Sequence, residues 1–138
     1  FIMTFGRDFA YIGNQYHLEI FGEELFPDLL FLNRELNCMV VVELKKGAFK
    51  PAYIGQLQTY MKVLDDKVRK PHENPTIGIL LCKSANKAFV EYVIRDYTHP
   101  MGVATYKTAE DMSEELRKAL PDMDEMRKLL INESDTDN

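Results

Sequence analysis

Three charged residues stand in parts of the sequence that are otherwise apolar. Asp28 interrupts the apolar segment 25–32, while Glu43 and Lys45 end the valine-rich segment 40–45. Carboxylates are rarely placed in such surroundings unless they are paired or bound to a metal. Carboxylate oxygens are hard ligands, so the two acids predict a site for a divalent cation such as Mg²⁺ or Mn²⁺, with an ammonium group beside it.

The link between the two segments places these groups together. Residues 34–37 are too few for anything but a hairpin, and a turn at their two middle residues makes the numbers of facing residues add to 71. Asp28 then faces Glu43, with Cβ atoms about 4.5–5.5 Å apart. Lys45 shares their face of the sheet because side chains alternate along a strand. Two opposed like charges are destabilising, and a bridging cation would offset their repulsion.

Such a group of residues predicts metal-assisted hydrolysis of a phosphodiester. A divalent cation polarises a phosphoryl oxygen and generates hydroxide, while a lysine orients the water or stabilises developing charge. The sequence indicates no serine nucleophile and no Cys–His pair, which leaves a covalent acyl mechanism with little support. The alternative for Asp28, Glu43 and Lys45 is an ordinary salt bridge at strand ends that reach solvent.

The charge distribution is compatible with a polyanionic substrate despite a net charge of −5. Residues 110–138 carry a net charge of −6, so the rest of the chain carries +1, and segment 43–70 is locally basic. Lys46 and Lys50 flank the predicted site and would contribute salt-sensitive affinity for phosphates that does not depend on base sequence. Arg7 precedes the strands and is expected to do the same.

The pattern around these residues predicts an α/β (α+β) domain with a mixed central sheet. Three consecutive antiparallel strands form a meander, and helices then alternate with strands before two C-terminal helices. The strands are expected at 15–20, 25–32, 39–44, 76–82 and 102–106, and the helices at 51–70, 84–95, 110–120 and 122–131. Helices are expected on both faces of the sheet.

Helical spacing predicts which side chains face the core. The first helix has an apolar stripe and begins with a proline at a position where a missing N–H costs little. Tyr60 belongs to that stripe, so we interpret it as core packing. Ser84 is the expected N-cap of the second helix. The inward residues of that helix are predicted to be Ala88, Phe89, Tyr92 and Val93.

Length and composition limit the number of domains and the compartment in which the protein is expected. The chain of 138 residues fits one domain over residues 1–131 with a frayed acidic tail at 132–138. Cys38 and Cys82 lie in apolar segments, which favours core thiols in a reducing, cytoplasmic compartment. No apolar run approaches the roughly 20 residues that cross a bilayer, so no membrane partner is expected. The chain begins Phe-Ile-Met, so we expect a domain taken from a longer protein.

The motif Pro27-Asp28, followed after fourteen residues by Glu43-Leu44-Lys45, resembles the PD-(D/E)xK signature of the restriction-endonuclease-like superfamily. This resemblance implies that the Leu44 carbonyl also binds the metal and that Glu19 is an accessory metal ligand. A solvent-exposed charge is the alternative for Glu19. The superfamily often places a glutamine near the metal on the following helix, with an aromatic residue below it. Gln56 and Tyr60, one helical turn apart, match that arrangement, and Gln56 is expected to act in catalysis by orienting water or phosphate.

More closely, the chain resembles the nuclease domain at the C-terminal end of YhcG-like bacterial proteins, over residues 9–120. The matching stretches lie at 13–16, 23–31, 40–46, 49–51, 55–57, 74–78 and 81–84. The resemblance implies a Mg²⁺- or Mn²⁺-dependent DNA endonuclease. It also implies a preceding helical region that assists DNA binding or assembly, and a homodimer.

Two other functions fit the same residues. The domain would be a restriction-like module for nucleic-acid binding or assembly if its motif is retained without strong activity. It would act on RNA if the same fold is directed to that polymer, and nothing in the sequence separates RNA from DNA. The intact set of Asp28, Glu43 and Lys45 favours an enzyme.

Overall fold

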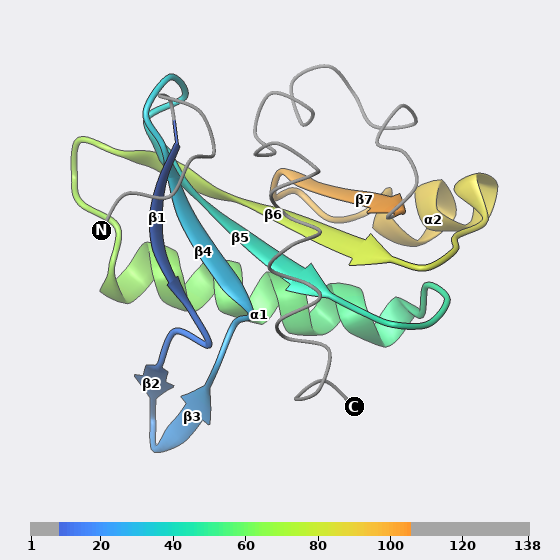
Figure 1. Cartoon of the computed structure of the whole chain (residues 1–138), viewed down its shortest axis with the longest axis horizontal. Helices are drawn as coiled ribbons and strands as arrows, with labels where there is room; N and C mark the ends of the chain where they lie inside the picture. The colour runs from blue at the N-terminus through green and yellow to red at the C-terminus, as the bar shows by residue number, and fades with distance from the viewer. Residues whose placement is uncertain (1–8, 106–138) are drawn as a thin grey trace.

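A computed structural model describes residues 9–105 of the chain, and its central element is a five-stranded mixed sheet (Figure 1). The strand order is β1-β4-β5-β6-β7, in which β1, β4 and β5 are antiparallel neighbours and β5, β6 and β7 are parallel. The strands of this sheet are β1 (Phe9–Asn14), β4 (Leu29–Asn33), β5 (Cys38–Leu44), β6 (Asn74–Cys82) and β7 (Met101–Thr105). The predicted α+β mixed sheet is confirmed.

The hairpin of β4 and β5 has the predicted register. Leu29 faces Val42 and Asn33 faces Cys38, so facing residues add to 71 throughout the pair. The side chain of Asn33 accepts a hydrogen bond from the Leu36 N–H at 3.0 Å and closes the turn. Asp28 lies one residue before β4, which sets it opposite Glu43 in this register.

The first strand of the meander lies earlier in the chain than predicted. The edge strand beside β4 is β1, and the predicted strand 15–20 contributes only β2 (Leu18–Ile20), which belongs to a separate two-stranded sheet. Gln15 adopts a positive φ of 49°, and a register shift between Tyr11 and Gly13 precedes it. The chain therefore leaves the central sheet at Gln15, which is the first residue of the predicted strand 15–20.

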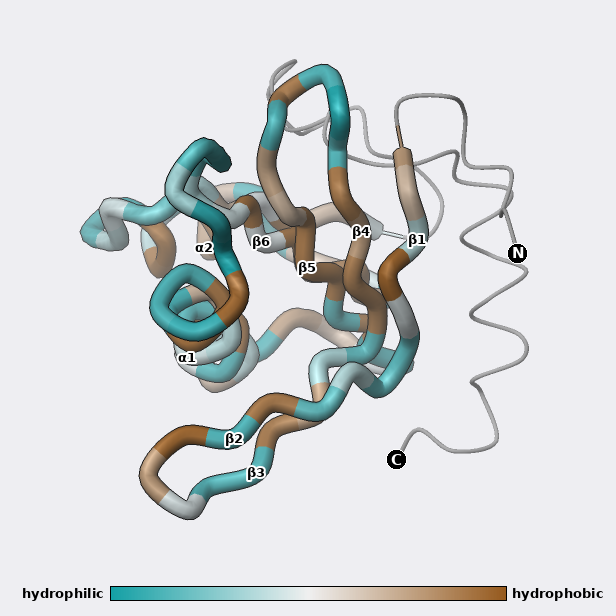
Figure 2. The backbone as a smooth tube through the Cα atoms, turned by 90° about the vertical axis from the view of Figure 1, so that its left-hand side faces the viewer, coloured by the Kyte–Doolittle hydropathy of each residue, from teal (hydrophilic) through white to brown (hydrophobic). Residues whose placement is uncertain are grey.

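Strands β2 and β3 (Glu23–Leu25) form a hairpin that projects from the body of the protein (Figures 1 and 2). Its tip is the two-residue turn of Phe21 and Gly22, both with positive φ, which is the backbone that tight hairpins require. The side chain of Phe21 is 97% exposed. At its base the hairpin rejoins the sheet beside Asp28, because the Gln15 N–H donates to the Asp28 carbonyl at 2.8 Å.

Helix α1 (Pro51–Lys67) connects β5 to the parallel strand β6 and packs on one face of the sheet. The apolar stripe that helical spacing predicts consists of Ile54, Leu57, Tyr60, Met61, Leu64 and Val68. All of these are buried except Val68, which lies just beyond the helix and is partly buried. Gly78 of β6 allows this close packing, because a Cβ there would lie 2.5 Å from the Met61 Sδ and 3.0 Å from the Leu57 Cγ.

Helix α2 (Lys87–Ile94) differs from its prediction in its start and its inward face. Asn86 caps the helix, not Ser84, and its side chain accepts a hydrogen bond from the Phe89 N–H at 3.1 Å. Val90 is the buried residue, with Val93 and Ile94 partly buried against the core. The predicted inward residues Ala88, Phe89 and Tyr92 are exposed. The helix is thus rotated by about one residue from the predicted orientation.

Apolar side chains on the two faces of the sheet form two core clusters. Both α1 and α2 contribute to the cluster that contains Leu30 and Val41, so within residues 9–105 the two helices lie on the same face (Figure 2). The opposite face carries a second buried cluster that includes Phe31 and Val40. The predicted helices 110–120 and 122–131 and the tail 132–138 lie outside the described residues. No helix in the described part of the chain is long and apolar enough to cross a membrane.

Candidate active site

Asp28 and Glu43 lie side by side on the face of the sheet that α1 covers. The Asp28 N–H donates to the Glu43 Oε2 at 2.6 Å, and the Leu44 N–H donates to the Asp28 Oδ2 at 2.9 Å. Glu43 is only 3% exposed although it carries a carboxylate. Main-chain donors to carboxylates are charge-assisted bonds, so they fix the positions of both groups.

Lys45 directly follows β5, two residues beyond Glu43, and its side chain contacts helix α1. Its main-chain N–H donates to the Leu81 carbonyl at 2.8 Å, which extends the pairing of β5 with β6 by one residue. Its ammonium group donates to the Gln56 Oε1 at 3.1 Å and lies 4.8 Å from the ring centroid of Tyr53. Both partners belong to α1, so the helix holds the amine on the same face as Glu43.

Tyr60 joins this group from one helical turn beyond Gln56. Its side chain is 6% exposed and hydrogen-bonds to Gln56. Burial, and then the negative charges of Glu43 and Asp28, raise the pKa of Tyr60 to about 12, against a smaller opposing effect of the Gln56 hydrogen bond. The interpretation of Tyr60 as core packing is confirmed by its burial, and the structure adds a polar contact at the site.

Gln15 is a site residue that the sequence pattern did not reveal. Its side-chain amide donates to the Asp28 Oδ1 at 2.8 Å, and its main-chain N–H donates to the Asp28 carbonyl at the same distance. The positive φ of Gln15 turns the chain so that both donors reach Asp28. No sequence signal marks such a residue, because the contact depends on how the hairpin leaves the sheet.

Glu19 lies in the projecting hairpin, where it faces Glu24 across the β2–β3 pair. Ligand atoms of His17, Glu19 and Glu24 lie within 4.8 Å of one another, and all three side chains are exposed. The His17 Nε2 is 3.1 Å from the Glu24 Oε1, and its ring stacks on Phe26 at 5.0 Å between centroids. The structure therefore groups Glu19 with His17 and Glu24 on the hairpin.

The remaining predicted residues lie around the end of β5. Leu44 is buried with the core cluster of the opposite face, so its main chain and not its side chain borders the site. Lys46 and Lys50 are exposed in the loop before α1, and the Lys50 Nζ lies 6.0 Å from the Tyr53 ring centroid. Arg7 lies outside the described residues.

The donor set at the site fits a hard divalent cation. Two carboxylates and a main-chain carbonyl at the end of a strand are the oxygen ligands that Mg²⁺ and Mn²⁺ prefer. The buried carboxylate of Glu43 accepts from the Asp28 N–H, and a bound cation would compensate its negative charge further. Asp28, Glu43 and Leu44 are the residues of this chain that would hold the ion.

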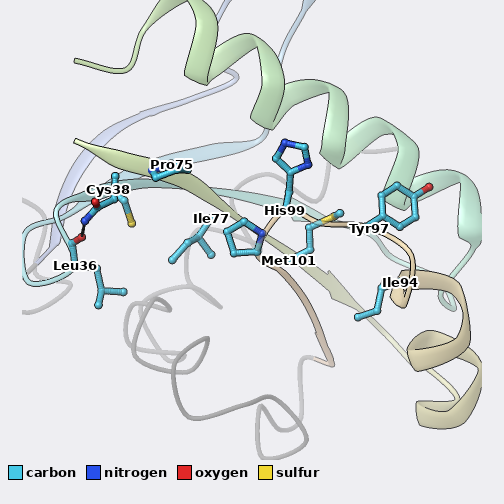
Figure 3. Close-up of a pocket in the computed structure, with 10 residues that line it drawn as sticks. Leu36, Cys38, Pro75, Ile77, Ile94, Tyr97, His99 and Met101 are labelled. Atoms are coloured by element: carbon cyan, nitrogen blue, oxygen red, sulfur yellow. Dashed lines mark hydrogen bonds between the residues drawn. The ribbon is translucent and has the colours of Figure 1, made fainter. Parts of the chain in front are cut away.

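A separate cavity of about 690 Å³ lies between the start of β6 and the segment from α2 to β7 (Figure 3). Its described lining is mostly apolar and includes Cys38, Ile77, Ile94 and Met101. No carboxylate is among the described residues that line it, and none of the predicted site residues reaches it. The cavity therefore does not explain the placement of the charged groups.

Comparison with known proteins identifies relatives of this chain. The family model described as "YhcG PDDEXK nuclease domain" matches residues 1–121. The protein named "Putative nuclease YhcG" from Escherichia coli (strain K12) is 33% identical over 107 residues, which is 78% of this chain and 28% of that protein.

Two solved structures are also similar to this chain. A repair endonuclease from Pyrococcus abyssi is 16% identical with a TM-score of 0.49, over 70% of this chain and 38% of that one. The EndoMS–dsDNA2 complex is 18% identical with a TM-score of 0.49, over 72% of this chain and 36% of that one.

Proposed function

Because the chain belongs to the YhcG PDDEXK nuclease domain family, we propose that it is a divalent-metal-dependent endonuclease that hydrolyses phosphodiester bonds in DNA. The observation that supports this most directly is the hydrogen-bonded pair of Asp28 and Glu43 with Lys45 on the same face. A salt bridge between strand ends would not need two carboxylates held together, one of them almost fully buried.

Each residue of the site has a separate role in the proposed hydrolysis. Asp28, Glu43 and the Leu44 carbonyl would hold Mg²⁺ or Mn²⁺, which supplies an activated water and polarises the phosphate. Lys45 would stabilise the negative charge that develops on the phosphate oxygens, because it is an ammonium group on the same face of the sheet. Gln56 positions that amine through its hydrogen bond, and Gln15 holds the Asp28 carboxylate. Glu19 remains a proposed accessory ligand.

The proposal also covers the neighbouring region of the whole protein, the oligomeric state and the compartment. The chain spans 28% of the length of the Escherichia coli relative, so we propose that a helical region precedes the domain in the whole protein and assists DNA binding. Cleavage of two strands would require two copies of the site, which favours a homodimer. The free, buried thiols of Cys38 and Cys82 fit a reducing cytoplasm.

Cleavage of plasmid DNA tests the function. With Mg²⁺ the protein should convert supercoiled plasmid to nicked and linear forms, and EDTA should stop the reaction. Lys45→Ala should slow cleavage by at least about 100-fold, which is the usual cost of removing a transition-state donor. Lys62→Ala removes an exposed lysine of α1 and is the matched control. Cleavage by Lys45→Ala at the rate of this control would contradict the assigned site.

Metal binding is measured separately by calorimetry with Mn²⁺. The protein should bind the ion, Asp28→Ala should lose binding, and Lys45→Ala should retain it, because the lysine is not a ligand in this scheme. Binding without cleavage of duplex, branched or single-stranded DNA would favour the binding module over the enzyme. Cleavage of RNA in preference to DNA would redirect the substrate assignment.

A further inference from the structure

Building on the proposed function, we infer that DNA leaves the site across a second basic loop, residues 83–87, and that Lys83 and Lys87 bind its phosphates. These two lysines follow β6 and are more than thirty residues from Lys46 and Lys50 in the sequence. The fold brings the two segments together at the same end of the sheet. This inference rests on the proposed function. It states that the bound DNA extends from Asp28 and Glu43 toward residues 83–87.

The loop 45–50 and the loop 83–87 form one continuous surface, which we call the paired loops. They meet because β5 and β6 are parallel neighbours, so the residues that follow each strand leave the sheet at the same edge. The Lys83 N–H donates to the Gly47 carbonyl at 2.9 Å, and the Phe49 N–H donates to the Ser84 carbonyl at 2.9 Å. A parallel bridge between Ala48 and Ser84 completes the pairing.

An aromatic contact fixes the paired loops against α2. The rings of Phe49 and Phe89 meet edge to face, with centroids 6.0 Å apart. Phe49 is buried at 9% exposure, whereas Phe89 is 44% exposed. Lys87, the first residue of α2, is therefore held beside the loop that contains Lys46 and Lys50, and the surface does not depend on a freely moving segment.

The paired loops lie in two stretches of the sequence that contain lysines and lack acidic residues. No aspartate or glutamate occurs between Glu43 and Asp65, or between Glu73 and Glu91. Exposed lysines lie at positions 46, 50, 83 and 87. Lysine side chains on a rigid surface beside a phosphodiester-cleaving site are suited to neutralise backbone phosphates.

The negative charge of the β2–β3 hairpin disfavours a path of DNA along that hairpin. The projecting hairpin carries Glu19, Glu23 and Glu24, all exposed. No lysine or arginine occurs between Arg7 and Arg34, so this hairpin has neither residue of its own to offset them. A polyanion at Asp28 and Glu43 is repelled along the hairpin and attracted along the paired loops.

The test compares two pairs of charge-removing substitutions. Lys83→Gln with Lys87→Gln removes the proposed contacts, and Lys62→Gln with Lys67→Gln removes two exposed lysines of α1 as the matched control. Binding of a fluorescein-labelled duplex of about 20 base pairs is followed by anisotropy over a range of KCl, with Ca²⁺ in place of Mg²⁺. The first pair should raise the Kd about 10-fold and lower the salt slope by about 2, since each phosphate contact contributes about 0.9. The control pair should change the Kd less than about 2-fold.

Other outcomes separate this inference from the proposed function. Wild-type-like binding and salt slope in Lys83→Gln/Lys87→Gln would overturn the inference, as would an equal loss in the control pair. If the wild type binds DNA but never cuts it, the proposed function fails, while a lower salt slope in the first pair still supports the paired loops. If the wild type cuts and the first pair cuts equally well at subsaturating DNA, the paired loops are not the path.

Discussion

Gln56 connects the proposed charge-stabilising lysine to the buried interior of the protein. Its side chain accepts from the Lys45 Nζ at 3.1 Å and hydrogen-bonds to Tyr60. Tyr60 in turn is buried in the core, so the exposed side chain of Gln56 links the amine of Lys45 to a buried residue. The geometry of the site therefore depends on α1 as well as on the strands.

We predict that Gln56→Ala slows cleavage about 10-fold while Mn²⁺ binding stays close to that of the wild type, because a displaced lysine affects charge stabilisation and not metal ligation. Single-turnover cleavage and calorimetry measure the two effects. Gln58→Ala, two positions along the same helix, is the control and should leave both unchanged. Equal cleavage rates in the two variants would show that Gln56 has no positioning role.

The acidic pair was predictable from sequence because its geometry depends on few variables. A four-residue link allows one hairpin, and the apolar pattern allows one register, so Asp28 and Glu43 could be paired by counting. Gln15 could not be found in this way, since its contact with Asp28 requires a positive φ and a bulged edge strand. The spacing of Gln56 and Tyr60 was visible in the sequence, but spacing alone does not show that the two side chains form a hydrogen bond.

At the level of the elements, strands and helices were easier to identify from sequence than their partners. Alternation at 15–20 has the same pattern whether a strand joins the central sheet or a two-stranded hairpin. In the structure β1, and not the segment 15–20, pairs with β4 at the edge of the central sheet. Helix α2 has eight residues and carries two overlapping apolar stripes. Packing selects the stripe with Val90 and Val93, and leaves Phe89 and Tyr92 exposed. Local periodicity contains no information that decides between such alternatives.

The close packing of α1 on β6 leads to a prediction about stability. Gly78→Ala would place a methyl group 2.5 Å from the Met61 Sδ and 3.0 Å from the Leu57 Cγ, so the helix or both side chains must shift. We expect a loss of about 1–3 kcal/mol in the free energy of unfolding. Urea denaturation followed by circular dichroism measures it.

Gly55→Ala is the matched control for this substitution. A Cβ at Gly55 meets nothing within 4 Å, and the residue lies inside α1. The same change should therefore stabilise the protein by about 0.5–1 kcal/mol, because alanine has the higher helix propensity. A destabilisation of the same size in both variants would show that the space around Gly78 is not the cause.

Across residues 9–105, acidic and basic side chains lie on different sides of the candidate site. The acidic hairpin β2–β3 and the loops that follow β5 and β6 lie on opposite sides of the molecule (Figure 1), and these loops carry the exposed lysines. An overall net charge of −5 therefore says little about the surface that a substrate meets. The basic segment 43–70 is visible in the sequence, but the contribution of residues 83–87 depends on the parallel pairing of β5 and β6.

Two buried thiols and a buried phenol, all with raised pKa values, predict how the stability of the fold depends on pH. Burial is the main cause that raises the pKa of Cys38 and Cys82 from 9.0 to about 11, and of Tyr60 from 10.0 to about 12. Between pH 9 and 12 the unfolded chain releases protons that the native state retains. Stability should therefore be unaffected by these groups below about pH 9 and should fall as the pH rises through their folded pKa values.

The free energy of unfolding, measured in urea at intervals from about pH 7 to 12, tests this dependence. A group whose pKa is higher by one in the native state than in the unfolded chain contributes about 1.4 kcal/mol, so the fall should amount to several kcal/mol over the three groups. Cys82→Ala removes one group, and although this variant begins less stable at about pH 7, its deficit should shrink between about pH 9 and 11. A deficit that stays constant with pH would show that the Cys82 thiol ionises as readily in the native state as in the unfolded chain. The burial of the strand that ends at Cys82, directly beside the proposed DNA path, would then be less complete than the structure indicates.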